Sequence, residues 1–340
     1  TSPTPRLPHL LHTPDSPQMF RIKRTWHYFA SRSQSPPTSP KSALPVARID
    51  PIVVPERTVS ISILPGEIID QVLAHLVGSQ DALEACTLVC QRWRALAQPR
   101  LFHRIVLTTE ELPKSIAFQR FLLDSPNIRS GIREITVHFP DLSSWPTDRK
   151  VAANLMGDIL EVLPRPESLR LYGARYSDYR VKWTRLSAHL KNSIRTVLRR
   201  PSLSHLLIDG WLLDVNLPGF NVIFSNTTPS LTSLALLDIS DSIWGTLEHV
   251  PEPPVRHHLD SLTVSNTFAK DFKLIQGLGH PNCIFDVRSL KTLRVEESRD
   301  DNSVSNLVST IGASLERLEV NLSTDCPIHF SSMNVLMRPI

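Results

Sequence analysis

The sequence predicts an α/β protein in which a small three-helix unit precedes a curved, repetitive domain built on a parallel sheet. Between Ile61 and Leu107, 26 of 47 residues are Ala, Val, Ile, Leu, Cys, Phe or Trp, against 41% apolar residues in the whole chain. Beyond Leu107 a Leu-x-x-Leu-x-Leu pattern recurs. The predicted organisation is therefore a tail over residues 1–58, a helical unit over 59–107 and a repeat domain over 108–340.

The tail is predicted to be disordered. Eleven of its 58 residues are proline, and such a composition buries too little apolar surface to offset chain entropy. Its Ser-Pro and Thr-Pro pairs suit proline-directed kinases, although a solvated linker is the simpler interpretation. It holds eight Lys or Arg and three Asp or Glu, whereas the rest of the chain holds 29 and 30. Because the predicted folded part is near neutral, we expect no nucleic-acid binding.

The helical unit can be followed from its start signals. Pro65 suits a first helical position, and apolar residues then recur every three or four positions to Val77, which predicts a helix over 65–77. Asp81 is the expected cap of a second helix, and a third is expected to be interrupted near Pro99. So small a unit cannot hide all of its apolar surface, so part of that surface is expected to face a partner.

The order of motifs in this unit resembles the F-box. It runs Leu-Pro-x-Glu-Ile, Val-Leu-x-x-Leu, Asp-x-Leu, Leu-Val-Cys, Trp-Arg-x-Leu-Ala and Leu-Phe-x-x-Ile. A generic amphipathic segment explains the periodicity but not Pro65, Cys90 and Trp93 in their places, and Cys86 is expected to be internal. The resemblance implies binding to the Skp-type adaptor of a cullin-RING ubiquitin ligase. The residues it implies as adaptor contacts are Leu64, Pro65, Ile68, Leu73, Leu88, Val89 and Trp93.

The second half of the chain is repetitive. The full copies are Ile132-Ile135-Val137, Leu203-Leu206-Ile208, Leu231-Leu234-Leu236, Leu259-Leu262-Val264, Leu290-Leu293-Val295 and Leu315-Leu318-Val320, with a partial copy at Leu169-Leu171. The last five start 28, 28, 31 and 25 residues apart, which resembles the leucine-rich repeat. The last two apolar positions of each copy face inward from a strand, and the intervening stretches carry helical periodicity. Parallel strands backed by helices are therefore expected.

The repeats also depart from that family. Leucine-rich repeats place Asn or Cys three residues after the last strand leucine, whereas this chain has the residues Trp211, Ile239, Thr267, Ser298 and Ser323 there. We therefore expect an irregular solenoid without an asparagine ladder.

The outward positions of the predicted strands form a candidate substrate-binding surface. Its candidate residues are His205, Leu207, Asp209, Leu237, Thr263, Arg294, Glu296, Arg317 and Glu319. Arg294 and Glu319 occupy equivalent positions on neighbouring strands, so their charges serve either a substrate or each other. Both interpretations stay open.

Motifs for catalysis, metals and cofactors are absent from the sequence: it has no phosphate-binding glycine loop, Gly-x-Ser-x-Gly, His-Glu-x-x-His or Cys-x-x-Cys. We therefore expect no metal and no cofactor. Four scattered cysteines fit a reducing compartment, and no apolar run reaches 18 residues, so the expected location is the cytoplasm or nucleus without a membrane span. A start at Thr1 instead of Met is compatible with a fragment.

Together these patterns predict a non-catalytic substrate-recognition subunit of an SCF-type (Skp-cullin-F-box) ubiquitin ligase. The helical unit would hold the adaptor and, through it, a cullin, while the repeat domain would hold a protein substrate. One alternative is an adaptor-bound scaffold that acts outside the ligase. Another is an enzyme with a site assembled from His205, Asp209 and His258.

Overall fold

The computed structural model describes residues 64–108, 112–139, 147–173, 180–213, 217–225, 227–239, 252–253, 255–265, 273–298 and 301–322. The predicted disordered tail, 1–58, lies outside these residues. The chain divides into two compact units, 1–101 and 102–340, which are described separately.

In its described part, residues 64–101, the first unit contains three helices. They are α2 (Gly66–His75), α3 (Gln80–Val89) and α4 (Gln91–Leu101). The second helix begins one residue before Asp81, so this aspartate lies in the first turn and is not the N-cap. The third helix continues through Pro99, which corrects the expected interruption. Pro99 lies in the last turn, where its missing N–H removes a single helical hydrogen bond and the helix ends two residues later.

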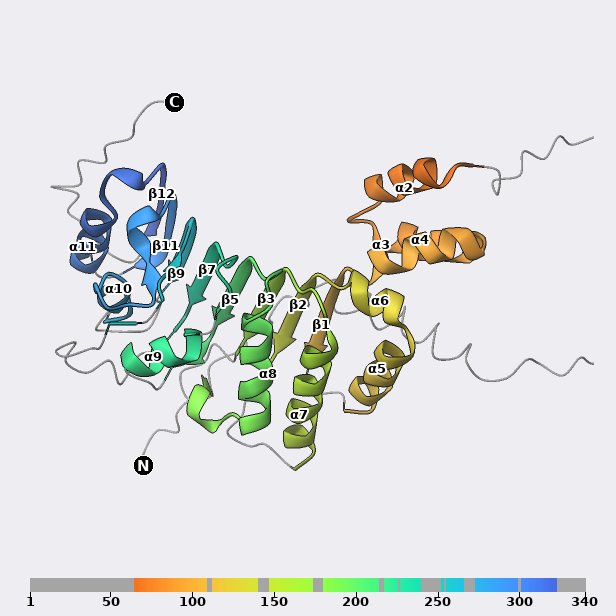
Figure 1. Cartoon of the computed structure of the whole chain (residues 1–340), viewed down its shortest axis with the longest axis horizontal. Coiled ribbons are helices and arrows are strands. Elements are labelled where there is room, and N and C mark those ends of the chain that lie inside the picture. Colours follow the sequence, from red (N-terminus) through yellow and green to blue (C-terminus); the bar gives the residue numbers. More distant parts are fainter. Residues whose placement is uncertain are drawn as a thin grey trace, which may run out of the picture. The chain divides into compact units, whose positions relative to one another are not determined.

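The second unit is organised around one eight-stranded parallel sheet (Figure 1). Its strands are β1 (Arg104–Thr108), β2 (Glu134–His138), β3 (Ser168–Tyr172), β5 (His205–Asp209), β7 (Ser233–Leu237), β9 (Ser261–Ser265), β11 (Thr292–Ser298) and β12 (Arg317–Leu322). They lie side by side in chain order. The pairing keeps one register across the sheet, so the first residues of all eight strands form a single row.

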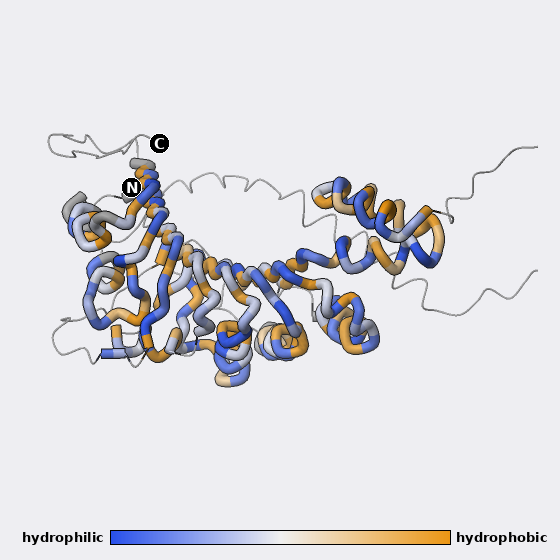
Figure 2. The backbone as a smooth tube through the Cα atoms, turned by 45° about the horizontal axis from the view of Figure 1, so that its top comes forward, coloured by the Kyte–Doolittle hydropathy of each residue, from blue (hydrophilic) through white to orange (hydrophobic). Residues whose placement is uncertain are grey.

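Side chains alternate across this sheet as the repeat pattern predicts. From β1 to β11 the inward positions are almost fully buried, for example Leu169 and Leu171 on β3 and Leu234 and Leu236 on β7, whereas Leu318 and Val320 on the edge strand β12 are half-buried. Outward positions such as Leu207 remain partly exposed. In both units hydrophobic and hydrophilic residues alternate over short distances (Figure 2). The parallel sheet is thus confirmed.

Helices cover one face of the sheet (Figure 1). They are α5 (Leu112–Asp124), α6 (Pro126–Gly131), α7 (Thr147–Val162), α8 (Ala188–Leu198), α9 (Leu217–Phe224), α10 (Lys273–Leu278) and α11 (Asp301–Ile311). Helix α8 begins where the Ser187 hydroxyl accepts a hydrogen bond from the Leu190 N–H at 3.2 Å. It packs closely on α7, because a Cβ at Gly157 would lie 2.9 Å from the Ser193 hydroxyl oxygen. Leu155 and Ile159 of α7 are buried, as the helical periodicity predicts.

Short strands and single turns of 3-10 helix complete the connections. The strands β4 (Val181–Lys182) and β6 (Trp211–Leu212) pair with each other, as do β8 (His257–His258) and β10 (Phe285–Asp286). The 3-10 turns are η3 (Trp183–Arg185), η4 (Val287–Ser289) and η5 (Gly312–Ser314).

At two of the positions where leucine-rich repeats carry Asn or Cys, this chain has buried apolar side chains. Trp211 is fully buried, with its ring 5.4 Å from that of Phe139 and 6.2 Å from that of Trp183 between centroids. Ile239, in the equivalent place of the next repeat, is also fully buried. Apolar contacts therefore support these turns. Thr267 and Ser323 lie outside the described residues.

Strand β1 was not among the predicted repeats. The sequence Arg104-Ile105-Val106-Leu107 was assigned to the end of the helical unit, but it pairs with β2 and belongs to the second unit. Ile105 and Leu107 point inward and are buried, which is the same alternation as in the later strands. The signal in the sequence is the spacing of Phe102, Ile105 and Leu107, which matches the repeat with Phe in its first position, although Val106 between the last two is also apolar.

Adjacent leucines on β5 allow a test of this alternation. Leu206 is buried and Leu207 points outward. Leu206→Ala should lower the free energy of unfolding of the second unit by about 2–5 kcal/mol, because a cavity replaces the side chain. Leu207→Ala should cost less than about 1 kcal/mol. Urea denaturation followed by circular dichroism measures both, and equal losses would contradict the assigned faces.

Candidate partner-binding surfaces

Helix α2 is apolar on two faces. Ile69 and Leu73 are fully buried between the helices of the first unit. Ile68 and Val72, one turn apart on another face, are 42% and 40% exposed. Three short helices supply too little interior to enclose both stripes, so one stripe is left open to solvent.

Contacts from α4 hold α2 in place. The Arg92 guanidinium donates a hydrogen bond to the Leu64 carbonyl oxygen at 2.7 Å, and Arg100 pairs with the Asp70 carboxylate at 2.7 Å. The hydrogen bond from Arg100 also lowers the pKa of Asp70 below its usual value. These polar contacts do not cover the face of α2 that carries Ile68 and Val72.

The large exposed apolar residues in the described part of this unit lie on α2, just before and just after it, and at the end of α3. We call them the apolar face; its members are Leu64, Ile68, Val72, Val77, Leu88 and Val89. Exposed branched apolar residues in this number are unusual on so small a unit, and larger exposed apolar patches mark protein interaction sites. Val72 and Val77 were not among the predicted contacts, although Val72 lies four residues from Ile68 and so shares its helix face.

Five of the seven predicted adaptor contacts are exposed: Leu64, Pro65, Ile68, Leu88 and Val89. Leu73 and Trp93 are not. Leu73 is fully buried and Trp93 is 8% exposed, so their predicted contact with the adaptor is not visible at the surface of this chain and stays a prediction. Both belong to the core on which the three helices pack. Cys86, expected to be internal, is half-buried, and this burial raises the pKa of its thiol.

The family comparison coincides with this helical unit. Residues 61–108 match the F-box-like family. F-box domains bind Skp-type adaptors and act as non-catalytic components. The F-box-like match contains the whole apolar face and does not extend over the rest of the sheet. A comparison with curated proteins finds no match to the chain.

The outward face of the parallel sheet is a second candidate surface. Most of the predicted substrate residues lie on it with partial or full exposure: His205, Leu207, Leu237, Thr263, Arg294, Glu296, Arg317 and Glu319. The common register aligns Leu207, Thr263, Arg294 and Glu319 in one row across the strands. They therefore belong to one continuous face.

Asp209 is the exception among the predicted substrate residues. Its side chain is 1% exposed, although its place at the end of β5 predicts an outward position. The chain turns immediately afterwards at Gly210, whose φ is +70°, and the buried Trp211 follows. The negative charges of Asp209 and Asp238 raise the pKa of nearby Arg180, although burial, the larger effect, lowers it. Asp209 is therefore enclosed at the end of β5, and its predicted contact with a substrate stays a prediction.

Charges on the outward face pair with one another at both ends of the sheet. Arg294 lies 2.8 Å from Glu296 and 3.7 Å from Glu319, which in turn pairs with Arg317. At the other end, Glu134 pairs with Arg104 at 2.7 Å and with Arg170 at 3.6 Å. The predicted substrate surface began at His205, so it did not include these three residues of β1, β2 and β3.

Between the two charged clusters the outward face is mostly uncharged. On β5, β7 and β9 its half-exposed members are Leu207, Ser233, Ala235, Leu237, Ser261 and Thr263. We call this set the central strip. Small and apolar side chains allow a partner to approach the strands closely without desolvating a charge.

The structure does not assemble the alternative enzyme site. His205 and Asp209 stand at opposite ends of β5, about 13 Å apart at the usual strand rise. His258 lies on β8, a strand of a different sheet, near Asp286 at 3.5 Å. Among the described residues, no group of three or more His, Cys, Asp or Glu is arranged to hold a metal ion. Within the same part of the chain, no helix is long and apolar enough to cross a membrane.

Two adjacent isoleucines test the division of α2 into a core face and an open face. Ile69→Ala should lower the stability of the first unit by about 2–5 kcal/mol because it leaves a cavity. Ile68→Ala removes a 42% exposed side chain and should cost less than about 1 kcal/mol. Hydrogen exchange at α3 and α4 amides reports the difference. Similar protection losses in both variants would show that Ile68 also belongs to the core.

Proposed function

We propose that this chain is a substrate-recognition subunit of an SCF-type ubiquitin ligase. The F-box-like match over residues 61–108, which contains the exposed apolar face, carries the proposal. In this role Leu64, Pro65, Ile68, Leu88 and Val89 contact the Skp-type adaptor, joined by Val72 and Val77. Leu73 and Trp93 act indirectly by holding the helices that present these side chains.

The energetic reason for adaptor binding is removal of this apolar face from water. Each exposed branched side chain contributes up to about 1.5–3 kcal/mol when it becomes fully buried. Association must also overcome the loss of rotational and translational freedom, so several such side chains are needed together. The spread of the apolar face over α2 and α3 supplies them.

We propose that the second unit is a leucine-rich-repeat-like domain that recruits a protein substrate. The repeat spacing, the single register of the strands and the helices on one face support this interpretation. The substrate would lie on the outward face, with the central strip at its middle and the paired charges at its ends. The adaptor would connect the bound substrate to a cullin.

The mechanism of such a subunit is proximity. Holding a substrate beside a charged ubiquitin carrier raises the local concentration of its lysines, and no nucleophile is required from this chain. Its place of action would be the cytoplasm or the nucleus, in agreement with the scattered cysteines.

Adaptor co-purification tests the first half of the proposal. Full-length chain carrying Ile68→Asp and Leu88→Asp should recover at least about tenfold less Skp-type adaptor, because each carboxylate would be buried unpaired in the interface. Val222→Asp, on exposed Val222 of α9, is the matched control and should recover as much as the wild type. Equal recovery by all three proteins would contradict the proposed contacts.

The same experiment separates the ligase from the alternative scaffold role. Cullin should accompany the adaptor bound to the wild-type chain. Recovery of adaptor without cullin, under conditions in which the adaptor itself binds cullin, would favour the scaffold.

A substitution on the central strip tests the proposal that the second unit recruits a protein substrate. Thr263→Arg places a long cation among uncharged side chains and should reduce capture of proteins whose abundance rises on proteasome inhibition. Adaptor recovery should be unchanged. Val151→Arg, on the exposed side of α7, provides the control for an added charge elsewhere in the second unit. Loss with Val151→Arg but not with Thr263→Arg would place the substrate on the helical side.

A further inference from the structure

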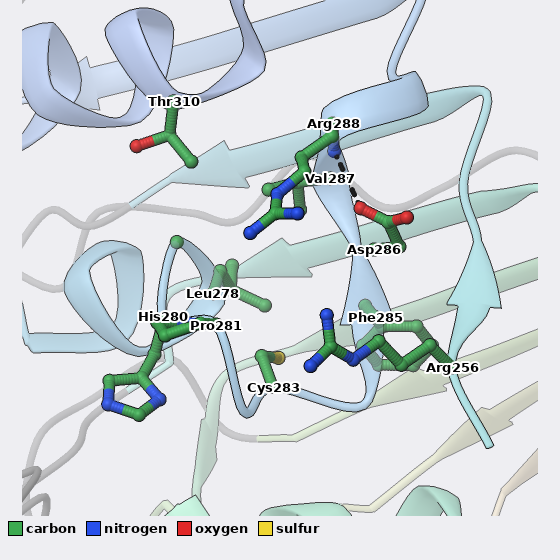
Figure 3. A pocket seen from close by; sticks show the side chains of 11 residues that line it. Arg256, Leu278, His280, Pro281, Cys283, Phe285, Asp286, Val287, Arg288 and Thr310 are labelled. Atoms are coloured by element: carbon green, nitrogen blue, oxygen red, sulfur yellow. Dashed lines mark hydrogen bonds between the residues drawn. The ribbon is translucent and has the colours of Figure 1, made fainter. Parts of the chain in front are cut away.

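An open hollow lies on the crossover side of the second unit, away from the outward face of the sheet. Its space, including the part open to solvent, is about 240 Å³. The connection between β9 and β11 forms most of its wall, with Arg256 just before β8 and Thr310 of α11 completing it. Figure 3 shows this hollow from close by.

Two guanidinium groups from separate segments converge on the hollow. Those of Arg256 and Arg288 both extend toward the space above Cys283, whereas the imidazole of His280 points away from it (Figure 3). In the part of the chain that the structure describes, Arg288 forms no ion pair with a carboxylate. Two like charges directed at one space are more stable when an anion lies between them.

Two carboxylates lie near the arginines: that of Asp286 lines the hollow itself, and that of Glu252 lies beside Arg256. Asp286 accepts a hydrogen bond from the Arg288 backbone N–H at 3.0 Å and lies 3.5 Å from His258. Glu252 lies 2.9 Å from Arg256, but its side chain is 72% exposed, so the pair is weak and yields to a stronger anion. Both carboxylates thus position the arginine-bearing segments.

The floor of the hollow is apolar. Leu278, Cys283 and Phe285 are buried there, and burial raises the pKa of the Cys283 thiol to about 12, so it stays neutral. Backbone hydrogen bonds and the positive charge of Arg256 act in the opposite direction on this pKa. An apolar floor excludes water from one side of a bound ion and strengthens its attraction to the rim.

We propose that Arg256 and Arg288 form a binding site for a phosphate-type oxyanion. Guanidinium groups present paired N–H donors whose spacing matches the oxygens of phosphate, and two of them can hold different oxygens of one group. The hollow is open on one side, so the phosphate can be free or attached to a side chain of another protein. This site is separate from the adaptor and substrate surfaces and does not depend on the proposed ligase role.

Titration of the full-length chain with two probes tests the site at low ionic strength, where screening is small. The probes are inorganic phosphate, followed by ³¹P line broadening, and the peptide acetyl-Gly-phosphoserine-Gly-amide, followed by calorimetry against its unphosphorylated form. Saturable binding of at least the phosphopeptide is expected. Arg288→Gln should weaken it at least about tenfold, the usual effect of removing a charged hydrogen-bond donor.

Three further variants keep the result interpretable. Arg256→Gln should weaken binding like Arg288→Gln, whereas Glu252→Gln should leave binding unchanged or tighten it because it frees Arg256. Arg185→Gln, at an exposed arginine of η3, should have no effect. Binding of both probes identifies a site for free anions, and binding of the phosphopeptide alone identifies a site for a phosphorylated partner. Absence of saturable binding, or equal affinity in wild type and Arg288→Gln, would overturn the proposal.

Discussion

The common register of eight parallel strands is the constraint on which the second unit depends. Every strand presents two apolar side chains to the same layer, and the helices cover that layer from one side. A slip of one residue in any strand would place its leucines in water and its polar residues in the core. The apolar pairs of each repeat therefore also keep the outward residues aligned in rows, so the core determines the shape of the candidate binding surface.

The same register explains where charges occur. Neighbouring strands place equivalent residues side by side. A charged side chain on the outward face therefore lies next to the equivalent side chain of the next repeat. Glu134 lies between Arg104 and Arg170 on the adjoining strands, and Glu319 lies beside Arg294. Because such exposed pairs contribute little stability, their main effect is to leave the ends of the face nearly neutral. In the proposed role, selectivity for a substrate would then depend on the uncharged central strip.

Local periodicity allowed the strands and helices to be predicted, because alternation and three-to-four spacing are properties of neighbouring residues. Exposure was less predictable where it depends on tertiary packing. Leu73 and Ile68 belong to the same amphipathic pattern, yet only packing against α4 decides which of them is buried. Asp209 follows the outward alternation of β5, but the turn at Gly210 and the packing of Trp211 enclose it. The hollow at Arg256 and Arg288 joins segments that no short sequence motif connects.

Among the residues that the motif singles out on the F-box-like segment, some are exposed and others are buried. A motif identifies which residues matter to a docking unit without separating those that touch the partner from those that hold the unit together. Trp93 and Leu73 are buried here, so loss of adaptor binding after their substitution would follow from unfolding as readily as from a lost contact. Ile68 and Leu88 are exposed and contribute little to the core. Only variants at such exposed positions distinguish recognition from stability, and so the assignment of function to this surface depends on them.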